Sequence, residues 1–214
     1  MKVVGVIPSR YSSTRLPGKP LKDIYGKSMV QRVYERAKQS KLLDEVIVAT
    51  DDKRIVEEVE RFQGKAVMTS VNHSNGTSRI AEAIKNLNVD LAINIQGDEP
   101  FIRFEMIDEL AEILIKDDDI LMATLCYELH DKNKFKDENV VKVVCDTYGN
   151  ALYFSRSLIP FPRREINFKV YEHIGIYGYR KSFLQEFVKL DDTPLSIIES
   201  LEQLKVLEYG YKLY

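Results

Sequence analysis

Near the start of the chain, the segment Val3-Val4-Gly5-Val6-Ile7 runs directly into the loop Pro8-Ser-Arg-Tyr-Ser-Ser-Thr-Arg-Leu-Pro-Gly-Lys-Pro20. A short apolar run bounded by a polar loop is typical of a strand that is buried on both faces. Strands of this kind belong to parallel sheets that helices cover on each side. The order of the segments that follow therefore decides whether the chain builds such a sheet.

Strand-like and helix-like segments alternate through the first half of the chain. Apolar runs predict further strands at 45–49, 65–68 and 91–95. Apolar residues at helical spacing predict helices at 29–37, 55–62 and 80–87. This alternation predicts an α/β fold with a three-layer, Rossmann-like arrangement, in which helices cover both faces of a mainly parallel sheet. Ligands of such sheets bind beyond the carboxyl ends of the strands, so the loops after the strands are the places to search for a site.

The pattern changes after about residue 120. Apolar strands at 120–127 and 140–145 flank a charged stretch, 132–138, that we expect to be a solvated loop. A turn cluster at 146–150 leads to a strand at 151–154, which predicts a hairpin. A strand at 173–180 and a final helix at 195–207 follow. We expect one domain over residues 1–214, with an α/β half at 1–127 and a smaller mixed β part at 128–214.

Composition narrows the class of protein. The 214 residues include 31 basic and 33 acidic side chains, so the net charge of −2 argues against nucleic acid or an anionic membrane as a partner. An apolar fraction of 44% is enough for a sizeable core. No apolar run is long enough for a membrane span or a signal peptide. The chain has only two cysteines, which is too few for a disulfide framework and favours reduced thiols. These features predict a cytoplasmic enzyme or binding domain.

The loop after the first strand carries Arg10, Arg15 and Lys19, together with three hydroxyl side chains and no acid. A polyphosphate needs both kinds of group, because hydroxyl and backbone donors shape a cradle and cations offset the charge. The loop lacks the glycine spacing of a P-loop or a dinucleotide fingerprint. Its place after the first strand favours phosphate binding over the alternative, a basic surface loop.

The loop after the fourth strand reads Gln96-Gly97-Asp98-Glu99-Pro100. A carboxylate at a strand end, facing a phosphate-binding loop, suits Mg²⁺ that is bridged to substrate phosphates. The amide of Gln96 can read a base or a sugar. Gly-Asp and Glu-Pro are also common turn dipeptides, so this segment predicts a metal site only in combination with the phosphate-binding loop after the first strand.

The remaining candidates come from later or less specific segments. In the loop at 72–79, Thr77 or Ser78 is expected to cap the following helix, whose N-terminus can hold an anion. His73 has no partner at metal spacing, and we assign it no catalytic role. Arg156 is a natural clamp for a carboxylate. His173 and Tyr177 share a strand face and either bind sugar hydroxyls or belong to the core.

Helical spacing places Glu199, Glu202 and Gln203 on one face of the final helix, where acids are often simply solvated. Neither cysteine has neighbours arranged for nucleophilic catalysis, and no serine lies in a nucleophile elbow.

With these residues in place, the sequence resembles the 3-deoxy-manno-octulosonate (KDO) cytidylyltransferase family, also called CMP-KDO synthetases. The matching segments span nearly the whole chain: Ile7–Pro20, Val48–Asp51, Gln96–Pro100, Tyr153–Arg156, His173–Arg180 and Glu199–Leu204. The first and third fit nucleotidylyltransferases in general, and the last three point to this sugar acid.

The resemblance implies a nucleotidyltransferase fold, CTP and KDO as substrates, Mg²⁺ as cofactor, and a homodimer in contact through its middle hairpin region. The products would be CMP-KDO, for lipopolysaccharide assembly, and pyrophosphate, formed by in-line attack of the anomeric hydroxyl on the α-phosphorus. The CTP site would comprise Pro8, Ser9, Arg10, Arg15, Lys19, Asn75, Gly76, Arg79 and Gln96. Arg10, Lys19 and Asp98 would be catalytic, with Asp98 as the metal ligand. The KDO pocket would comprise Arg156, His173, Tyr177, Glu202 and Gln203.

The chain departs from the family pattern at four places. Ser78, Ser196 and Lys205 replace an acid, a glutamate and an arginine. The resemblance also leads us to expect a Gly-Val-Asp-Thr-type segment beyond Tyr214, with a second metal ligand that these 214 residues do not supply. Two alternatives follow: a cytidylyltransferase for a related sugar acid, such as 8-amino-KDO or a sialic acid, or a nucleotide-binding protein with impaired catalysis.

Overall fold

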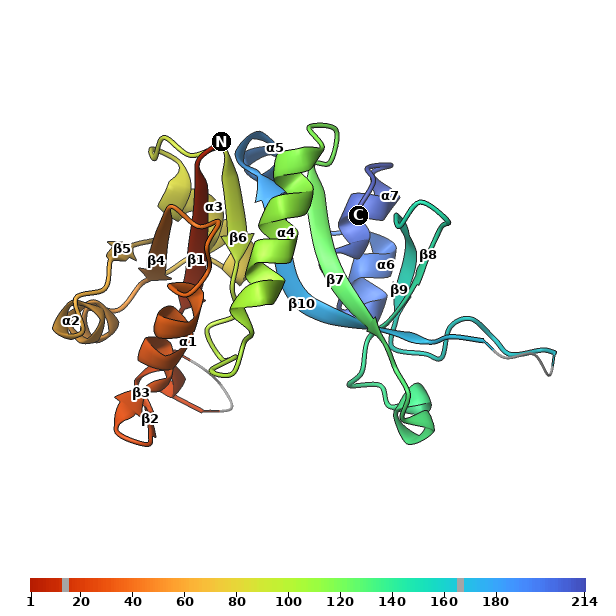
Figure 1. Cartoon of the computed structure of the whole chain (residues 1–214), viewed down its shortest axis with the longest axis horizontal. Coiled ribbons are helices and arrows are strands. Elements are labelled where there is room, and N and C mark those ends of the chain that lie inside the picture. The colour runs from red at the N-terminus through yellow and green to blue at the C-terminus, as the bar shows by residue number, and fades with distance from the viewer. Residues whose placement is uncertain (13–15, 165–167) are drawn as a thin grey trace.

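The computed structural model describes residues 1–12, 16–164 and 168–214. One sheet runs through the chain in the order β5-β4-β1-β6-β10-β8-β9, with β7 paired to β10 (Figure 1). The strands of the first half are β1 (Val3–Ser9), β4 (Glu45–Thr50), β5 (Ala66–Met68) and β6 (Leu91–Asn94), and they pair in parallel. The strands of the second half are β7 (Met122–Glu128), β8 (Lys142–Cys145), β9 (Ala151–Ser155) and β10 (Tyr171–Arg180), and they pair antiparallel. A separate small hairpin joins β2 (Asp23–Ile24) to β3 (Lys27–Ser28).

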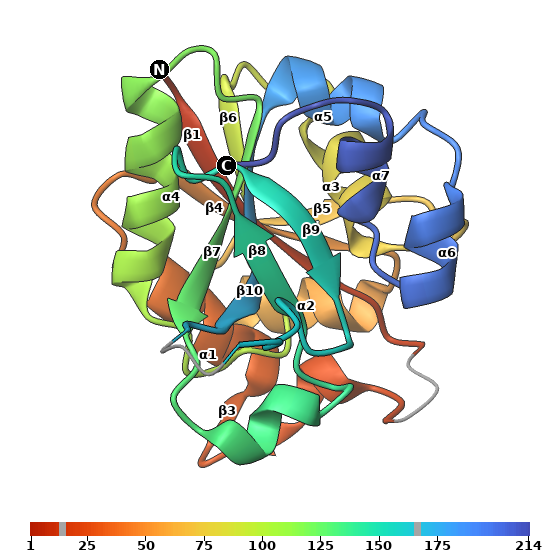
Figure 2. The same cartoon turned by 90° about the vertical axis from the view of Figure 1, so that its right-hand side faces the viewer.

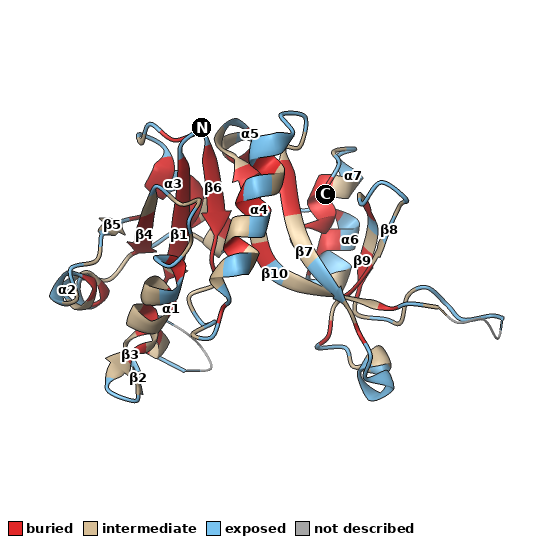
Figure 3. Cartoon of the chain, in the orientation of Figure 1, coloured by how far each residue is buried: buried red, intermediate tan, exposed pale blue. Residues whose placement is uncertain are grey.

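Helices cover both faces of this sheet, as the alternation of segments predicts. One face carries α1 (Met29–Ala37), α2 (Lys53–Arg61) and α4 (Phe104–Lys116); the other carries α3 (Gly76–Ile84), α5 (Lys181–Phe187), α6 (Pro194–Glu199) and α7 (Leu204–Glu208) (Figure 2). In β1, Val3 and Ile7 are buried against the first group, and Val4 and Val6 against the second. Figure 3 shows the resulting buried band along β1, β4 and β6. The α/β fold class is confirmed.

Strand β10 joins the two halves of the chain. Its last residues pair with β6, its first residues pair with β8, and β7 runs along most of its length. The predicted hairpin of β8 and β9 is present, and Asp146 Oδ1 accepts hydrogen bonds from the amides of Tyr148 and Asn150 in its turn. The C-terminal residues hydrogen-bond to both β7 and β9, since the carbonyls of Tyr214 and Leu213 accept from the amides of Thr124 and Ala151 (Figure 2).

Several local expectations were wrong. The final helix is two short helices, because Ser200 adopts a left-handed conformation (φ 52°, ψ 49°) that ends α6. The side chain of Asn75, rather than that of Thr77 or Ser78, caps α3 by accepting from the amide of Ser78. The charged stretch contains a short 3₁₀ helix, η2 (Lys132–Lys136). Helices α4 and α5 were not predicted. None of the described helices is long and apolar enough to cross a membrane.

Candidate active site

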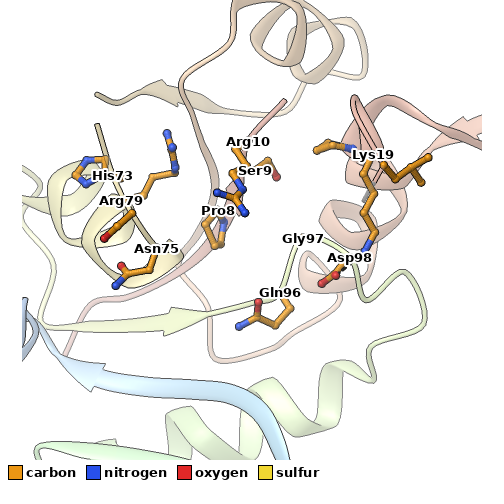
Figure 4. A pocket seen from close by; sticks show the side chains of 14 residues that line it. Pro8, Ser9, Arg10, Lys19, His73, Asn75, Arg79, Gln96, Gly97 and Asp98 are labelled. Atoms are coloured by element: carbon orange, nitrogen blue, oxygen red, sulfur yellow. Dashed lines mark hydrogen bonds and ion pairs between the residues drawn. The ribbon is translucent and has the colours of Figure 1, made fainter. Parts of the chain in front are cut away.

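A cavity of about 650 Å³ opens where β1 and β6 end and α3 begins (Figure 4). It is lined by Pro8, Ser9, Arg10, Leu16, Lys19, Pro20, His73, Ser74, Asn75, Gly76, Arg79, Gln96, Gly97 and Asp98. The three loops that the sequence singles out separately therefore meet at one place. Every residue of the expected CTP site that the structure describes lines this cavity. Arg15 lies outside the described residues.

The loops after β1 and β6 approach each other closely at Gly97. A Cβ atom on this residue would lie 2.8 Å from the carbonyl oxygen of Pro8 and 3.0 Å from Ser9 Oγ. Only glycine fits this distance without a shift of the backbone. The hydroxyl of Ser9 is buried and has no hydrogen-bond partner among the described residues, so it is available to a ligand in the cavity.

Lys19 and Asp98 connect the same two loops through an ion pair. Lys19 Nζ lies 2.6 Å from Asp98 Oδ2, and both side chains are partly exposed. The described residues hold no group of three or more potential metal ligands. Mg²⁺ is commonly bound by one or two carboxylates together with substrate phosphates. One carboxylate beside a cation-lined loop therefore fits a magnesium ion shared with a nucleotide.

Arg79 is buried on the side of the cavity next to α3. Its Nη2 donates to Asp51 Oδ2 at 2.7 Å, and its Nη1 donates to Thr69 Oγ1 at 2.6 Å. The exposed fraction is 3% for the Arg79 side chain and 15% for that of Asp51. Asp51, to which the sequence assigns no function, thus fixes the guanidinium at the cavity wall.

His73 also belongs to this wall, although sequence reasoning gave it no role. Its Nδ1 lies 3.0 Å from Ser78 Oγ, and its Nε2 contacts the carboxylate of Glu82. Glu82 also accepts a hydrogen bond from the amide of Ser70. This bond and the contact with His73 hold the pKa of Glu82 below its usual value. The histidine therefore fastens the loop before α3 to the body of that helix.

Two predicted sugar-binding residues lie side by side on β10, outside the cavity lining. The ring centroids of His173 and Tyr177 are 5.4 Å apart, and His173 Nε2 lies 3.0 Å from Thr124 Oγ1. Burial lowers the pKa of His173 to about 4 and raises that of Tyr177 well above its usual value. Both side chains are therefore neutral near pH 7 and suit hydrogen bonding to hydroxyl groups.

Glu202 links this second half of the chain to the cavity. Its carboxylate accepts from Asn75 Nδ2 at 2.9 Å and from Thr77 Oγ1 at 2.8 Å. Burial raises the pKa of Glu202. The break at Ser200 places Glu202 and Gln203 between α6 and α7, so the expected common helix face with Glu199 does not exist. Gln203 is buried, and its Nε2 has no partner among the described residues.

Arg156 is held by backbone oxygens. Its Nε donates to the carbonyl of Glu199 at 2.8 Å and its Nη1 to that of Glu138 at 2.9 Å. Within the described part of the chain, no acid lies at ion-pair distance from this guanidinium. The guanidinium is therefore held in place without an ion pair to a described acid. The amide of Gln96 supplies a further link between the halves, since its Nε2 donates to the carbonyl of Gly175 on β10 at 2.9 Å.

A sheet whose parallel half ends in a cation-lined cavity with one carboxylate fits the class of nucleotidyltransferases. The profile of the family described as cytidylyltransferase matches residues 4–213. The chain belongs to the 3-deoxy-manno-octulosonate cytidylyltransferase family, as its resemblance predicts.

Several relatives carry the name 3-deoxy-manno-octulosonate cytidylyltransferase, among them the two that follow. The protein from Fusobacterium nucleatum is 56% identical over 214 residues, which cover all of this chain and 87% of the relative. The protein from Thermodesulfovibrio yellowstonii is 49% identical, with coverage of 100% and 89%. A relative from Shewanella pealeana, 50% identical with coverage of 100% and 89%, is named 8-amino-3,8-dideoxy-manno-octulosonate cytidylyltransferase.

Among solved structures, that of CMP:2-keto-3-deoxy-manno-octonic acid synthetase complexed with CTP superimposes with a TM-score of 0.96. It is 45% identical, and the match covers all of this chain and 88% of that one. A cytidylyltransferase from Leptospira borgpetersenii, 20% identical with a TM-score of 0.64, shares the fold; that match covers all of this chain and 74% of that one.

Proposed function

We propose that this enzyme transfers the cytidylyl group of CTP to 3-deoxy-manno-octulosonate and releases pyrophosphate. The observation that carries the proposal is the convergence of all the described residues of the expected CTP site on one cavity. Two contacts, from Gln96 to Gly175 and from Asn75 to Glu202, join this cavity to the elements that hold the predicted sugar-binding residues. The names of the relatives and of the superimposed structure support this substrate pair.

In the proposed reaction, the anomeric hydroxyl oxygen of the sugar attacks the α-phosphorus of CTP. A bond forms between this oxygen and phosphorus, and the bond from the α-phosphorus to the bridging oxygen breaks. Pyrophosphate leaves with the electron pair of that bond, and the proton of the attacking hydroxyl group passes to water. Arg10 and Lys19 hold the phosphates and offset the charge that develops on the leaving group. Positioning and electrostatics supply most of the rate, so no covalent enzyme intermediate is needed.

Asp98 would hold magnesium together with the nucleotide phosphates. When bound, the ion would neutralise phosphate charge. Lys19 contacts only Oδ2 of Asp98, and its flexible stem also allows the ammonium group to move to a phosphate. Both groups therefore act at the boundary between the loops after β1 and β6.

At the sugar end, we assign the carboxylate of KDO to Arg156, whose guanidinium has no acidic partner in the described part of the chain. His173 and Tyr177 would bind hydroxyl groups in their neutral forms. Gln203 Nε2 is a buried donor that a sugar oxygen would satisfy. Glu202 would orient the end of the pocket next to Asn75.

We further propose that the enzyme works as a cytoplasmic homodimer and supplies CMP-KDO for lipopolysaccharide. Apolar side chains exposed on β9 and α6 favour a subunit contact near the hairpin; Leu152 is 61% exposed and Ile198 is 82% exposed. The free thiols of Cys126 and Cys145 suit a reducing compartment. Sedimentation equilibrium tests the oligomeric state: a dimer that Leu152→Lys dissociates supports this surface, and a monomeric wild type overturns it.

A pyrophosphate-release assay tests the function, with CTP, Mg²⁺ and each of KDO, 8-amino-KDO and a sialic acid as acceptors. We expect turnover with KDO and a product with the mass of CMP-KDO. A strong preference for 8-amino-KDO would assign the enzyme to the activity named for the Shewanella relative. CTP binding by calorimetry without turnover of any acceptor would overturn the proposal in favour of a nucleotide-binding protein.

A further inference from the structure

A stacked pair of side chains joins the phosphate-binding loop to α2. The guanidinium carbon of Arg54 is 3.4 Å from the centroid of the Tyr11 ring. A guanidinium over an aromatic ring at this distance makes a cation–π contact. Neither side chain is among the described residues that line the cavity.

Asp52, which follows strand β4, holds the side chain of Arg54 in its orientation. Its Nε and Nη2 donate to the two carboxylate oxygens of Asp52 at 2.9 and 2.6 Å. Asp52 caps α2 by accepting from the amide of Arg54, and its own amide donates to Thr50 Oγ1 at the end of β4. Because β4 pairs with β1, the guanidinium is anchored on the strand next to the one from which the phosphate-binding loop departs.

Tyr11 closes the base of that loop. Its carbonyl oxygen accepts from the amide of Gly18 at 2.9 Å. Gly18 has a left-handed conformation (φ 68°), and a Cβ atom there would lie 3.2 Å from Tyr11 Cε2. Arg10 and Lys19 directly flank these two residues, so the position of Tyr11 determines where both cations enter the cavity.

We infer that Tyr11 and Arg54 are positioning residues for the triphosphate of the nucleotide. The stack fixes Tyr11 against α2, and Tyr11 holds the two ends of the loop together. Arg10 and Lys19 are thereby held in place before the nucleotide binds, so binding does not pay a further entropic cost for ordering the loop. This inference rests on the proposed function, because it takes CTP as the ligand of the cavity.

Calorimetric titration of the full chain with CTP and Mg²⁺, in the absence of sugar, tests the inference. Loss of an exposed cation–π contact predicts that Arg54→Met and Tyr11→Leu each weaken CTP binding by about two- to fivefold. The double variant should be no weaker than either single variant, because both remove the same contact. Tyr11→Phe, which keeps the ring, should recover the affinity that Tyr11→Leu loses.

Arg61→Met is the matched control, since Arg61 lies on the same helix in an exposed ion pair with Glu58. It removes the same charge and should leave CTP affinity unchanged. Steady-state assays should show a higher KM for CTP in Arg54→Met, with an unchanged kcat and an unchanged KM for KDO.

Equal CTP affinity in Arg54→Met and wild type would overturn the inference. So would additive losses in the double variant, because Arg54 would then act on the phosphates through its charge alone. If the wild type binds no CTP, the proposed function itself fails, which is a distinct outcome. Thermal unfolding of each variant separates loss of positioning from loss of folded protein.

Discussion

Replacement of Gly97 by alanine should impair catalysis far more than folding. The new Cβ atom would lie 2.8 Å from the Pro8 carbonyl oxygen, which belongs to the central strand β1 and cannot yield. Ordinary contact requires roughly half an ångström more. The loop after β6 must therefore move away from β1, and it takes Gln96 and Asp98 with it.

The size of the effect follows from this displacement. Catalytic groups need placement within about 0.5 Å, and an error of 1 Å can cost about a hundredfold in rate. A shift of about half that size predicts a roughly tenfold loss of kcat for Gly97→Ala in the pyrophosphate-release assay. Overpacking of this kind costs about 1–3 kcal/mol of unfolding free energy, which corresponds to roughly 2–12 °C in Tm for a chain of this length.

Gly178→Ala is the matched control because it creates a clash elsewhere. Its Cβ atom would lie 2.6 Å from Leu114 Cδ1 and 3.1 Å from Ile93 Cδ1, both within the buried core beneath α4. We expect this variant to lose stability and to keep its kcat at a temperature where it is folded. Unchanged kcat in Gly97→Ala would refute the reasoning, because the close approach of the two loops would then have no effect on the site.

Three further perturbations address other parts of the site. Asp98→Asn should abolish turnover and keep CTP binding without metal, as calorimetry measures; near-normal turnover would contradict the assignment of the metal ligand. Arg79→Met should lower the unfolding free energy, measured in urea, by about 3 kcal/mol, since it leaves the Asp51 carboxylate without its partner. A loss below 1 kcal/mol would mean that this ion pair contributes no more than an exposed one. Because the folded pKa of Glu202 is raised, wild-type stability should fall as pH rises from about 4.5 through that raised value, relative to Glu202→Gln. Identical pH profiles in urea unfolding would show that burial of this carboxylate carries no such cost.

The sheet and the cavity were predictable because both depend on local pattern and on one topological rule. Residues 3–7 of β1 form an unbroken run without polar side chains, and this run indicates in the sequence that both faces of the strand are buried. The carboxyl ends of neighbouring parallel strands lie at one edge of the sheet, which brings the loops after β1 and β6 together without any knowledge of distances. Asn75 joins them because α3 begins at the same edge.

The errors arise where short segments depend on tertiary contacts. Helix α4 carries Ile107, Leu110, Ala111 and Leu114 at helical spacing, so the sequence does contain a signal for this helix. Helix α5 has only seven residues, too few for periodicity to decide between a helix and a loop. The break after α6 is made by Ser200 in a left-handed conformation, and no glycine marks the position.

Partners of the site residues were beyond the reach of sequence alone. Asp51 and Arg79 are 28 residues apart and form an ion pair only because β4 ends and α3 begins at the same edge. Glu202 reaches Asn75 across 127 residues. Composition and spacing can identify each of these residues as a candidate, but the contacts between the residues depend on how separate helices and strands pack.

The ion pair between Lys19 and Asp98 shows how one contact serves two assigned functions. Both residues are expected to bind the same substrate complex, one through phosphate and the other through metal, so that complex competes with their mutual bond. Exposed pairs contribute about 0–1 kcal/mol, and these side chains are 35% and 50% exposed. Breaking the bond therefore costs little in comparison with the new charge-assisted contacts to a triphosphate. The pair therefore links the two loops in this structure and opposes the binding of charged substrates only weakly.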